Sequence, residues 1–586
     1  MQASERREIL FVVLWSALVA ALTAIPYAFA QLWAGPNRVF AGFLWGPDEG
    51  NVYLAWIRQA SEGHLLLANQ YTIVNQNPHF FNVFLFILGA ACRYLGFTPI
   101  AAFHAARLLG IPVAIFAFYR LVAYVSEVSL VRLGAVVLVT IGSGFGWIFT
   151  LMAYTGMRPG FTPMDCASSW QVMPEAVTFL SFLLNPLFTW SLALMAATLL
   201  WAFRSMEKGR FGGILIAGLL LLVLGNVHTY DAFAIYAATF LWLLFLWKRR
   251  LLAFVRGAAL YILLVVLSIP SLLWARYASS ADPAYFAKIS TPTLSPRFLD
   301  YALGYGLLGI AALLGAIVAW RRRGRDQRPV APLLWALVTF ALVYAPVSFQ
   351  RKMIEGAHLA IACLAAFALA FALPLIAERR WPKTLTDDER SRRRHGLGLR
   401  AIVIVCLLAV PSNIVFVYDC LTHVQSNNAD LLSLLMPPAY LTTDEVAGLR
   451  WLGANTSYDD IILSSSLIGS HIPAFCPARV VAGHWAETLN FPAMARMVAT
   501  FYAPGLLVGI REAVLERTGA TYVWWGQYEQ FIQRSMAPAA AKAVGHPISM
   551  PDPPNRGLKA LHEVFRSGDV VIYRVVRAQP QPQSMP

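Results

Sequence analysis

The sequence carries unusually little charge. Asp, Glu, Lys and Arg make up 13% of its 586 residues, whereas these four are about a quarter of a typical soluble protein. Hydrophobic residues reach 58%, and apolar runs long enough to cross a bilayer recur along the chain. This composition excludes an ordinary soluble protein and predicts a polytopic α-helical membrane protein.

The sequence also lacks the short motifs of soluble nucleotide-binding and hydrolytic enzymes. It has no P-loop, no GxGxxG after a strand, no HExxH and no GxSxG. Its six cysteines form no CxxC pair, although Cys420 and Cys476 would both lie outside the cytoplasm and could form a disulfide. A soluble nucleotide pocket and a cysteine-ligated metal site are therefore not expected.

Twelve apolar runs are candidate membrane spans, and the first is expected to be retained as a helix. They are 9–30, 80–96, 108–125, 133–154, 177–203, 212–227, 232–247, 251–274, 302–319, 331–347, 357–376 and 400–418. We therefore predict a membrane domain over 1–418 with a first outer loop over 31–79. Residues 419–578 are expected to form a soluble α/β domain, and the Pro/Gln-rich 579–586 a disordered tail.

Basic residues gather in four short loops: 204–210, 248–250, 321–328 and 378–396. The positive-inside rule places all four in the cytoplasm, so the N-terminus lies inside and residues after about 419 lie outside. That topology needs an odd number of crossings, and twelve runs do not supply one. The error must lie between 80 and 203, where "TIGSGFGW" (140–147) or "LLNP" (183–186) could split a helix; thirteen crossings are favoured, with eleven as the alternative. Nucleic-acid binding is not expected, because the basic residues are scattered.

The segment after 419 mixes helix and strand signals. "TTDEVAGLRWLGANT" (442–456) begins with a Thr that can cap a helix. "DIILSSS" (460–466), "TYVWWG" (521–526) and "DVVIYRVV" (569–576) are typical of strands. This pattern predicts a small α/β domain.

Two adjacent carboxylates, Asp48 and Glu49, follow the first span in "FLWGPDEGNVYLAWIRQ". Acids at the membrane edge are costly and are candidates for function. The residues after them have amphipathic helical spacing, which predicts a helix lying on the membrane surface. The alternative is structural, with Asp48 as a helix cap and Glu49 in the first turn.

Two further polar motifs interrupt apolar stretches on the predicted outer side. "GNVHTYD" (225–231) contains His228, Tyr230 and Asp231, and is either a functional group or a tight turn. "FQRKMIEGAH" (349–358) contains Arg351, Lys352, Glu355 and His358, and Arg351, Glu355 and His358 would share one face of a helix. Cations outside break the positive-inside trend, so they favour an anion site; an internal Arg351–Glu355 salt bridge is the alternative.

The loop "VVAGHWAETLNFP" (480–492) follows a predicted strand and carries His484 and Glu487. It could contact a ligand above the membrane, or it could only pack the domain. The order of features along the whole chain is a first helix, an acid-bearing outer loop, many spans and an outer C-terminal domain.

This order, with "WGPDEGNVYLAWIRQASEG", resembles the membrane glycosyltransferases of the GT-C fold class, such as protein O-mannosyltransferases and aminoarabinose transferases. The resemblance implies a hexosyl- or pentosyltransferase in the inner (plasma) membrane. Its donor would be a polyprenyl-phosphate-linked sugar, and its acceptor an extracytoplasmic glycan, lipid or protein.

The resemblance also implies roles for individual residues. Asp48, with Glu49 as runner-up, would be the base in an inverting transfer. Arg351, Lys352 and His358 would bind the donor phosphate. The substrate-binding group would be His228, Tyr230, Asp231, Glu355, His484 and Glu487.

Three matters stay open at this point. Asp48, Glu49 and Asp231 offer oxygen ligands that could share a divalent cation such as Mg or Mn, but no spacing rule demands it. A transporter or lipid flippase is the alternative function, because charge at membrane depth also marks translocation. A third alternative is an inactive scaffold whose outer domain binds a partner.

Overall fold

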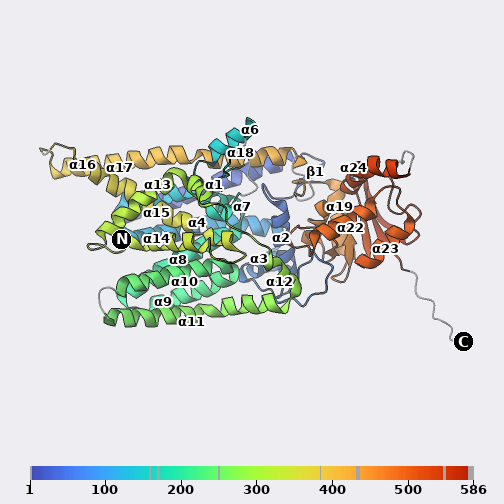
Figure 1. Ribbon diagram of the computed structural model, residues 1–586, viewed down its shortest axis with the longest axis horizontal. Coiled ribbons are helices and arrows are strands. Elements are labelled where there is room, and N and C mark those ends of the chain that lie inside the picture. The colour runs from blue at the N-terminus through green and yellow to red at the C-terminus, as the bar shows by residue number, and fades with distance from the viewer. Residues whose placement is uncertain are drawn as a thin grey trace.

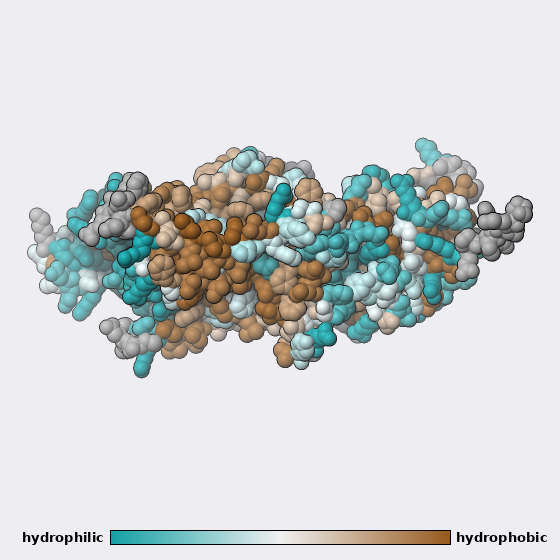
Figure 2. Space-filling view, turned by 90° about the horizontal axis from the view of Figure 1, so that it is seen from below, coloured by the Kyte–Doolittle hydropathy of each residue, from teal (hydrophilic) through white to brown (hydrophobic). Residues whose placement is uncertain are grey.

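The computed structural model describes residues 3–157, 160–167, 172–247, 251–382, 384–429, 436–544 and 550–577. Long helices lie side by side in a bundle, and a smaller domain built from the described segments after residue 436 caps one end of it (Figure 1). On the face seen in Figure 2, hydrophobic residues form a band across the bundle between two hydrophilic ends. The N-terminus lies at the bundle end opposite the small domain (Figure 1). The long apolar helices of the bundle confirm the polytopic α-helical fold class.

The bundle helices are α1 (Ala3–Trp33), α4 (Pro99–Val125), α5 (Ser129–Ile141), α8 (Pro186–Lys208), α9 (Phe211–Val227), α10 (Thr229–Trp247), α11 (Leu251–Ala281), α13 (Phe298–Arg322), α14 (Val330–Leu342), α15 (Ala357–Phe367), the π-helical η3 (Ala368–Ala372), α16 (Leu373–Glu378), α17 (Asp387–Ala409) and α18 (Pro411–Gln425). Shorter elements at the capped end or in outer loops are β1 (Arg38–Phe40), α2 (Pro47–Glu62), α3 (Val83–Leu95), α6 (Gly146–Tyr154), the 3₁₀ helices η1 (Pro174–Ala176) and η2 (Gln350–Ile354), α7 (Thr178–Leu184) and α12 (Pro283–Ser290).

Within the described residues, nine helices are long and apolar enough to cross a membrane, and α3, α9 and α14 are shorter apolar helices. Helix α3 does not cross. Its cap, Asn82, donates to the carbonyls of Asn226 and Val227 at the outer end of α9. The next helix, α4, starts at Pro99, and its His104 contacts the Gly42 carbonyl in the first outer loop. Both ends of α3 therefore lie at the same end of the bundle, the one expected to be outside.

The nine long spans together with α9 and α14 make eleven crossings in the described chain. The crossing expected over 80–96 is wrong, because Gly89 of α3 packs directly on Ala60 and Ser61 of α2 at the capped end. Eleven is odd, as an inside N-terminus and an outside C-terminal domain require. The favoured count of thirteen gives way to the alternative of eleven.

The two segments expected to break helices do so. The glycine-rich stretch ends α5 at Ile141 and starts α6 at Gly146, and the carboxylate of Asp165 accepts from the N–H groups of Gly144 (2.8 Å) and Gly146 (3.2 Å). In "LLNP", Asn185 is the N-cap of α8 and accepts from the N–H of Leu187 at 2.9 Å. Neither break adds a crossing.

The small domain contains β2 (Tyr440–Thr442), α19 (Thr443–Asn455), β3 (Ile461–Leu463), α20 (Ser466–Gly469), α21 (Ile472–Phe475), β4 (Arg479–Val480), α22 (Phe491–Tyr502), α23 (Val508–Thr518), β5 (Tyr522–Trp525), α24 (Gln527–Val544), β6 (Leu561–Ser567) and β7 (Val570–Val575). Its main sheet has the order β4-β3-β5-β7-β6, parallel across the first three strands and antiparallel across the last three. Thr442 and Glu445 form a capping box at the start of α19. The expected α/β architecture is confirmed, and the predicted tail over 579–586 lies outside the described residues.

The spacing of α2 had suggested a helix lying on the membrane surface, but the structure packs α2 against other elements of the protein. Helix α2 is packed between α3 and α4 of the bundle and α21 of the small domain, and one hydrophobic core includes residues of all these elements. Asn51 contacts His471 at 3.0 Å and Arg58 donates to the Pro473 carbonyl at 3.1 Å. The polar side of α2 faces the small domain instead of water.

The first outer loop and the small domain are also joined by backbone pairing. Strand β1 pairs antiparallel with β2, with Val39 opposite Leu441. Cys420 and Cys476 are both buried and are not joined to each other, so the disulfide considered for them is not formed.

We expect a fluorescent reporter that folds only in the cytoplasm to be dark when it is fused after Arg577. The reason is that the basic loops 204–210 and 321–328 lie at the bundle end opposite the small domain (Figure 1), and such loops are expected to stay inside. The same reporter fused to a chain that ends after Arg325 should fluoresce. Fluorescence from the Arg577 fusion would contradict the topology.

Candidate functional site

The "GPDE" sequence starts α2 and fixes its two acids. Gly46 is the N-cap in a left-handed conformation (φ 55°), and Pro47 occupies the first helical position, where its missing N–H is not needed. Asp48 and Glu49 therefore lie in the first turn, and Asp48 is not the cap. The two side chains differ in environment: that of Asp48 is 9% exposed and that of Glu49 is 60% exposed.

His484, from the loop after β4, reaches these acids from the small domain. Its Nε2 lies 3.6 Å from both Asp48 Oδ2 and Glu49 Oε1, which is longer than a hydrogen bond. Its Nδ1 accepts from the backbone N–H groups of Ala486 (3.0 Å) and Glu487 (3.2 Å). We therefore assign the proton to Nε2, which faces the acids without a hydrogen-bond partner in the described structure.

These surroundings separate the two acids chemically. Burial raises the pKa of Asp48 from 3.8 to about 6; the His484 contact opposes this shift and the Glu49 carboxylate adds to it. Partial burial also acts to raise the pKa of Glu49, but His484 and the charges of Lys288 and Lys352 outweigh it and lower this pKa. Near neutral pH, Glu49 is a fixed negative charge and Asp48 is close to its titration midpoint.

Lys288 of α12 and Lys352 of η2 supply the positive charge. Lys288 Nζ forms an ion pair with Glu487 and lies 4.2 Å from the ring centroid of Trp56. Lys352 Nζ lies 4.9 Å from the ring centroid of Tyr230. Within the described chain Lys352 has no ion-pair partner, so its charge is available to an anion.

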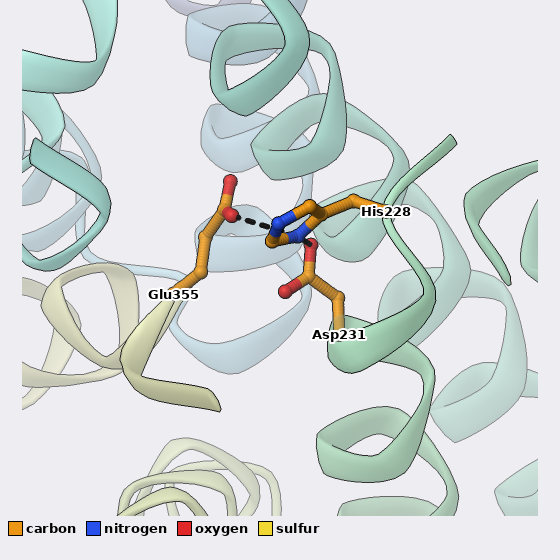
Figure 3. A group of neighbouring side chains, drawn as sticks. All are labelled: His228, Asp231 and Glu355. Carbon is orange, nitrogen blue, oxygen red and sulfur yellow. Dashed lines mark ion pairs between the residues drawn. The ribbon is translucent and has the colours of Figure 1, made fainter. Parts of the chain in front are cut away.

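A second cluster joins two of the motifs singled out in the sequence (Figure 3). His228 Nδ1 lies 3.0 Å from Asp231 Oδ2 and 3.1 Å from Glu355 Oε2. Asp231 and Glu355 are fully buried side chains, and the described structure gives their carboxylate oxygens no hydrogen-bond donor. Asp231 thus lies with His228 and Glu355, whereas Asp48 and Glu49 lie with His484. The sequence had left open an ion shared by Asp48, Glu49 and Asp231; these contacts divide the three acids between two clusters.

Tyr53 of α2 connects the two clusters. Burial raises the pKa of Tyr53, and the negative charges of Glu49, Glu487 and Glu355 raise it further. Carboxylates of both clusters therefore act electrostatically on its hydroxyl. On the other side, Tyr230 lies between His228, at 5.5 Å between ring centroids, and Lys352. The motifs from four distant parts of the sequence therefore form one site at the capped end of the bundle.

The segment from Arg351 to His358 is not one helix. The 3₁₀ helix η2 ends at Ile354, Glu355 is extended, and Gly356 has φ +83° before α15 begins. A side chain at Gly356 would collide with Met195 and Trp335, at 2.6 and 2.7 Å from the added carbon. The shared helical face expected for Arg351, Glu355 and His358 is wrong, because this turn sends the three side chains to different partners.

Arg351 pairs with Glu175, with 3.4 Å between Nε and Oε1, so the salt bridge to Glu355 that was the alternative for this motif is not formed. His358 is buried: its Nδ1 accepts from the N–H of Thr178 at 3.1 Å, and its ring stacks on Tyr305. The described contacts of His358 are thus in the bundle core and include neither Lys352 nor Arg351.

A small open cleft, with a cavity volume of about 10 Å³, lies beside the Lys288–Glu487 pair. Trp56, Phe80 and Tyr285 give it an aromatic wall, with ring centroids 5.0 Å apart for Trp56–Phe80 and 5.3 Å for Phe80–Tyr285. The amides of Asn69 and Gln76 also line it. Aromatic faces beside amide and charged groups can bind a molecule that is apolar on its faces and hydroxylated at its edge.

No protein-family model matches the chain, and no curated protein matches it. Among solved structures, the chain is similar to the Archaeoglobus fulgidus oligosaccharyltransferase (14% identity, TM-score 0.49, 90% of this chain and 72% of that one). It is similar to ArnT from Cupriavidus metallidurans (14% identity, TM-score 0.49, 97% of this chain and 99% of that one). It is also similar to the mycobacterial arabinofuranosyltransferase AftD (13% identity, TM-score 0.47, 96% of this chain and 40% of that one). Two of these names are those of glycosyl-transferring enzymes.

Several residues of the site were not expected from the sequence. Lys288 and Glu175 are single charges in segments that the topology puts outside, and a cation or acid alone in such a loop is a weak signal. Tyr53 and the aromatic wall carry no signal that distinguishes them from core residues. Their roles depend on contacts between segments hundreds of residues apart.

We expect Arg351→Ala to lower the stability of the protein by about 1–3 kcal/mol, because Glu175, buried at 6% exposure, would lose its partner. The double variant Arg351→Ala/Glu175→Gln should recover part of that loss. Thermal unfolding in detergent measures both effects. Arg556→Ala is the control, since its side chain is 68% exposed and 3.9 Å from Asp552. Equal losses in the single and double variants would contradict the pair.

Proposed function

We propose that the protein is a membrane glycosyltransferase that moves a sugar from a polyprenyl-phosphate donor to a hydroxyl on an extracytoplasmic acceptor. One observation carries the proposal. A buried carboxylate whose pKa is near neutral, an unpaired lysine and an aromatic-walled cleft lie together where the bundle meets the small domain. A donor whose lipid lies in the bilayer and whose sugar lies above it needs a site at that level.

The chemistry assigned to Asp48 is general base catalysis. Its carboxylate takes the proton of the acceptor hydroxyl as the oxygen attacks the anomeric carbon, and the bond from that carbon to the donor phosphate breaks. The proton goes to Asp48, the electron pair goes to the phosphate, and the configuration at the anomeric carbon inverts. A raised pKa suits this role, because a base near the working pH transfers protons most effectively.

The phosphate that leaves gains negative charge, and Lys352 is the cation assigned to it. In the described structure Lys352 forms no ion pair. Its Nζ lies 4.9 Å from the ring centroid of Tyr230, and its charge acts to lower the pKa of Glu49. Arg351 is already paired with Glu175, so we place it as a second contact behind Lys352. His358, buried against Thr178 and Tyr305, is left out of the donor site.

The sugar or the acceptor is assigned to the cleft beside Lys288 and Glu487. Pyranose and furanose rings have apolar faces that stack on aromatic side chains, and their hydroxyls bond to amides and carboxylates. Trp56, Phe80 and Tyr285 provide the first kind of contact, and Asn69 and Gln76 the second. We place the protein in the inner (plasma) membrane with the small domain outside.

A transporter remains the alternative from the sequence, and no described feature favours it over a transferase. A transport path needs polar groups along the bundle. The residues assigned here lie at one end, where the small domain covers them.

We expect Asp48→Asn to reduce transfer by about 100-fold or more, because the amide keeps the shape but cannot accept a proton. Glu49→Gln, which removes a 60% exposed side-chain charge, should cost less. The assay is transfer of radiolabelled sugar from a polyprenyl-phosphate donor by purified protein. Near-normal transfer by Asp48→Asn would eliminate Asp48 as the base.

The same assignment fixes a pH dependence. Asp48 acts as a base only when ionised, so transfer should fall as the pH drops through about 6, and not near 3.8 as for an unperturbed carboxyl. Because His484 opposes the rise in this pKa, His484→Gln should move the acid limb to higher pH. An acid limb that stays in place in His484→Gln would argue against the contact.

We expect Lys352→Ala to weaken the apparent affinity for the donor by roughly 10- to 100-fold, since a charge-assisted hydrogen bond is worth about 1.5–3 kcal/mol. Lys352→Arg should be intermediate. The KM for the donor and that for the acceptor are measured separately, and only the former should change. Lys559→Ala, an exposed lysine of the small domain, is the control. Unchanged donor KM in Lys352→Ala would leave the phosphate without its assigned cation.

A further inference from the structure

The cluster of His228, Asp231 and Glu355 has an arrangement that a hydrogen-bonded ion pair does not explain. Both carboxylates approach the same atom, Nδ1 of His228, at 3.0 and 3.1 Å. One N–H can donate fully to only one of them. In the described structure neither contact has the geometry of a hydrogen bond, and Nδ1 and all four carboxylate oxygens are without a hydrogen-bond partner.

With both carboxylates ionised, the charges of the cluster do not balance without another positive group. The side chains of Asp231 and Glu355 are 0% exposed, and that of His228 is 11% exposed. The nearby Glu175 is paired with Arg351, so that arginine does not compensate them. Two ionised carboxylates with one imidazolium leave a buried net charge of about −1, which is costly. A divalent cation with a neutral imidazole and two carboxylates is neutral.

The donor atoms also have the spacing of a coordination sphere. The three ligand atoms, one from each side chain, lie within 4.8 Å of one another. Zinc-type ions bind imidazole nitrogen and carboxylate oxygen at about 2.0–2.2 Å, which brings ligand atoms about 3–4 Å apart. Three protein ligands with one open position are typical of sites that also bind a substrate or water.

We propose that His228, Asp231 and Glu355 bind one divalent transition-metal cation of the Zn²⁺ or Mn²⁺ kind. One nitrogen and two carboxylate ligands suit these borderline ions better than Ca²⁺ or Mg²⁺, which prefer oxygen ligands alone. The backbone fixes the positions of the three ligands. His228 follows the last residue of α9, Asp231 lies in the first turn of α10, and Glu355 is the extended residue after η2.

A role for the ion follows only if the proposed function is right. His228 contacts Tyr230, and Tyr230 contacts Lys352, the cation assigned to the donor phosphate. The open position would then face the same phosphate and hold it together with Lys352. The binding of the ion itself does not depend on this role.

The first test measures metal directly. Protein purified without chelators is analysed by mass spectrometry for bound metal, then stripped and titrated with Mn²⁺, whose free form is followed by electron paramagnetic resonance. We expect about one ion per chain. Asp231→Asn and Glu355→Gln, which keep the side-chain shapes, should each weaken binding at least about tenfold. A wild-type protein that contains no metal and binds no Mn²⁺ at millimolar concentration would overturn the proposal.

The matched control is the other His–Asp pair of the bundle, Asp419 and His423, with 3.4 Å between Nε2 and Oδ2. No third ligand joins it within the described residues. Asp419→Asn should therefore leave Mn²⁺ binding unchanged. Equal losses in Asp419→Asn and Asp231→Asn would show a general loss of folding and would count against the site.

A variant of the base separates this proposal from the proposed function. Asp48→Asn should bind Mn²⁺ as the wild type does while its transfer is lost. If Mn²⁺ binds with the expected variant pattern but no donor is ever transferred, the metal site stands and the function fails. If transfer depends on Asp48 but no ion binds, the function stands and the metal site fails.

Discussion

Helix α2 is covered on both sides, and the site depends on that constraint. A helix that begins with Gly-Pro-Asp-Glu and continues with Asn51, Arg58 and Gln59 has too many polar groups to be buried in lipid. The small domain supplies partners for them, through His471, Pro473 and the loop around His484. Because one apolar core includes α2, α3 and the small domain, the domain cannot leave without exposing it.

This packing explains how two acids adjacent in sequence take different chemical states. The first turn of α2 directs Asp48 toward His484 in a buried position and leaves Glu49 mostly exposed. Burial raises the pKa of Asp48, and the neighbouring cations lower that of Glu49. The different pKa shifts of Asp48 and Glu49 thus depend on one turn of helix and one loop of another domain. Tyr53, one further turn along α2, extends the same arrangement to Glu355.

The broad architecture was predictable because it depends on local composition. Apolar runs, the Thr442 cap and the strands around 461, 522 and 570 are local signals, and the structure confirms them. The motifs "GNVHTYD" and "FQRKMIEGAH" were expected on the same face of the membrane, and the structure brings His228 and Glu355 of these motifs into contact. The crossing over 80–96 was wrong, since an apolar helix that packs on α2 has the same composition as one that crosses. The partner of Arg351 was not predictable either, because the 3₁₀ helix η2 and the extended Glu355 replace the α-helical spacing from which Glu355 was considered as a partner.

The central claim is that the phosphate of a polyprenyl lipid binds at the capped end of the bundle, between Asp48 and the His228 cluster. The most direct measurement is an electron cryo-microscopy structure of the full chain in lipid nanodiscs with a synthetic polyprenyl monophosphate. We predict phosphate density in contact with Lys352 Nζ, with the lipid tail leaving between bundle helices into the bilayer. Phosphate density among the basic loops at the opposite end, or along a path through the bundle, would contradict the account.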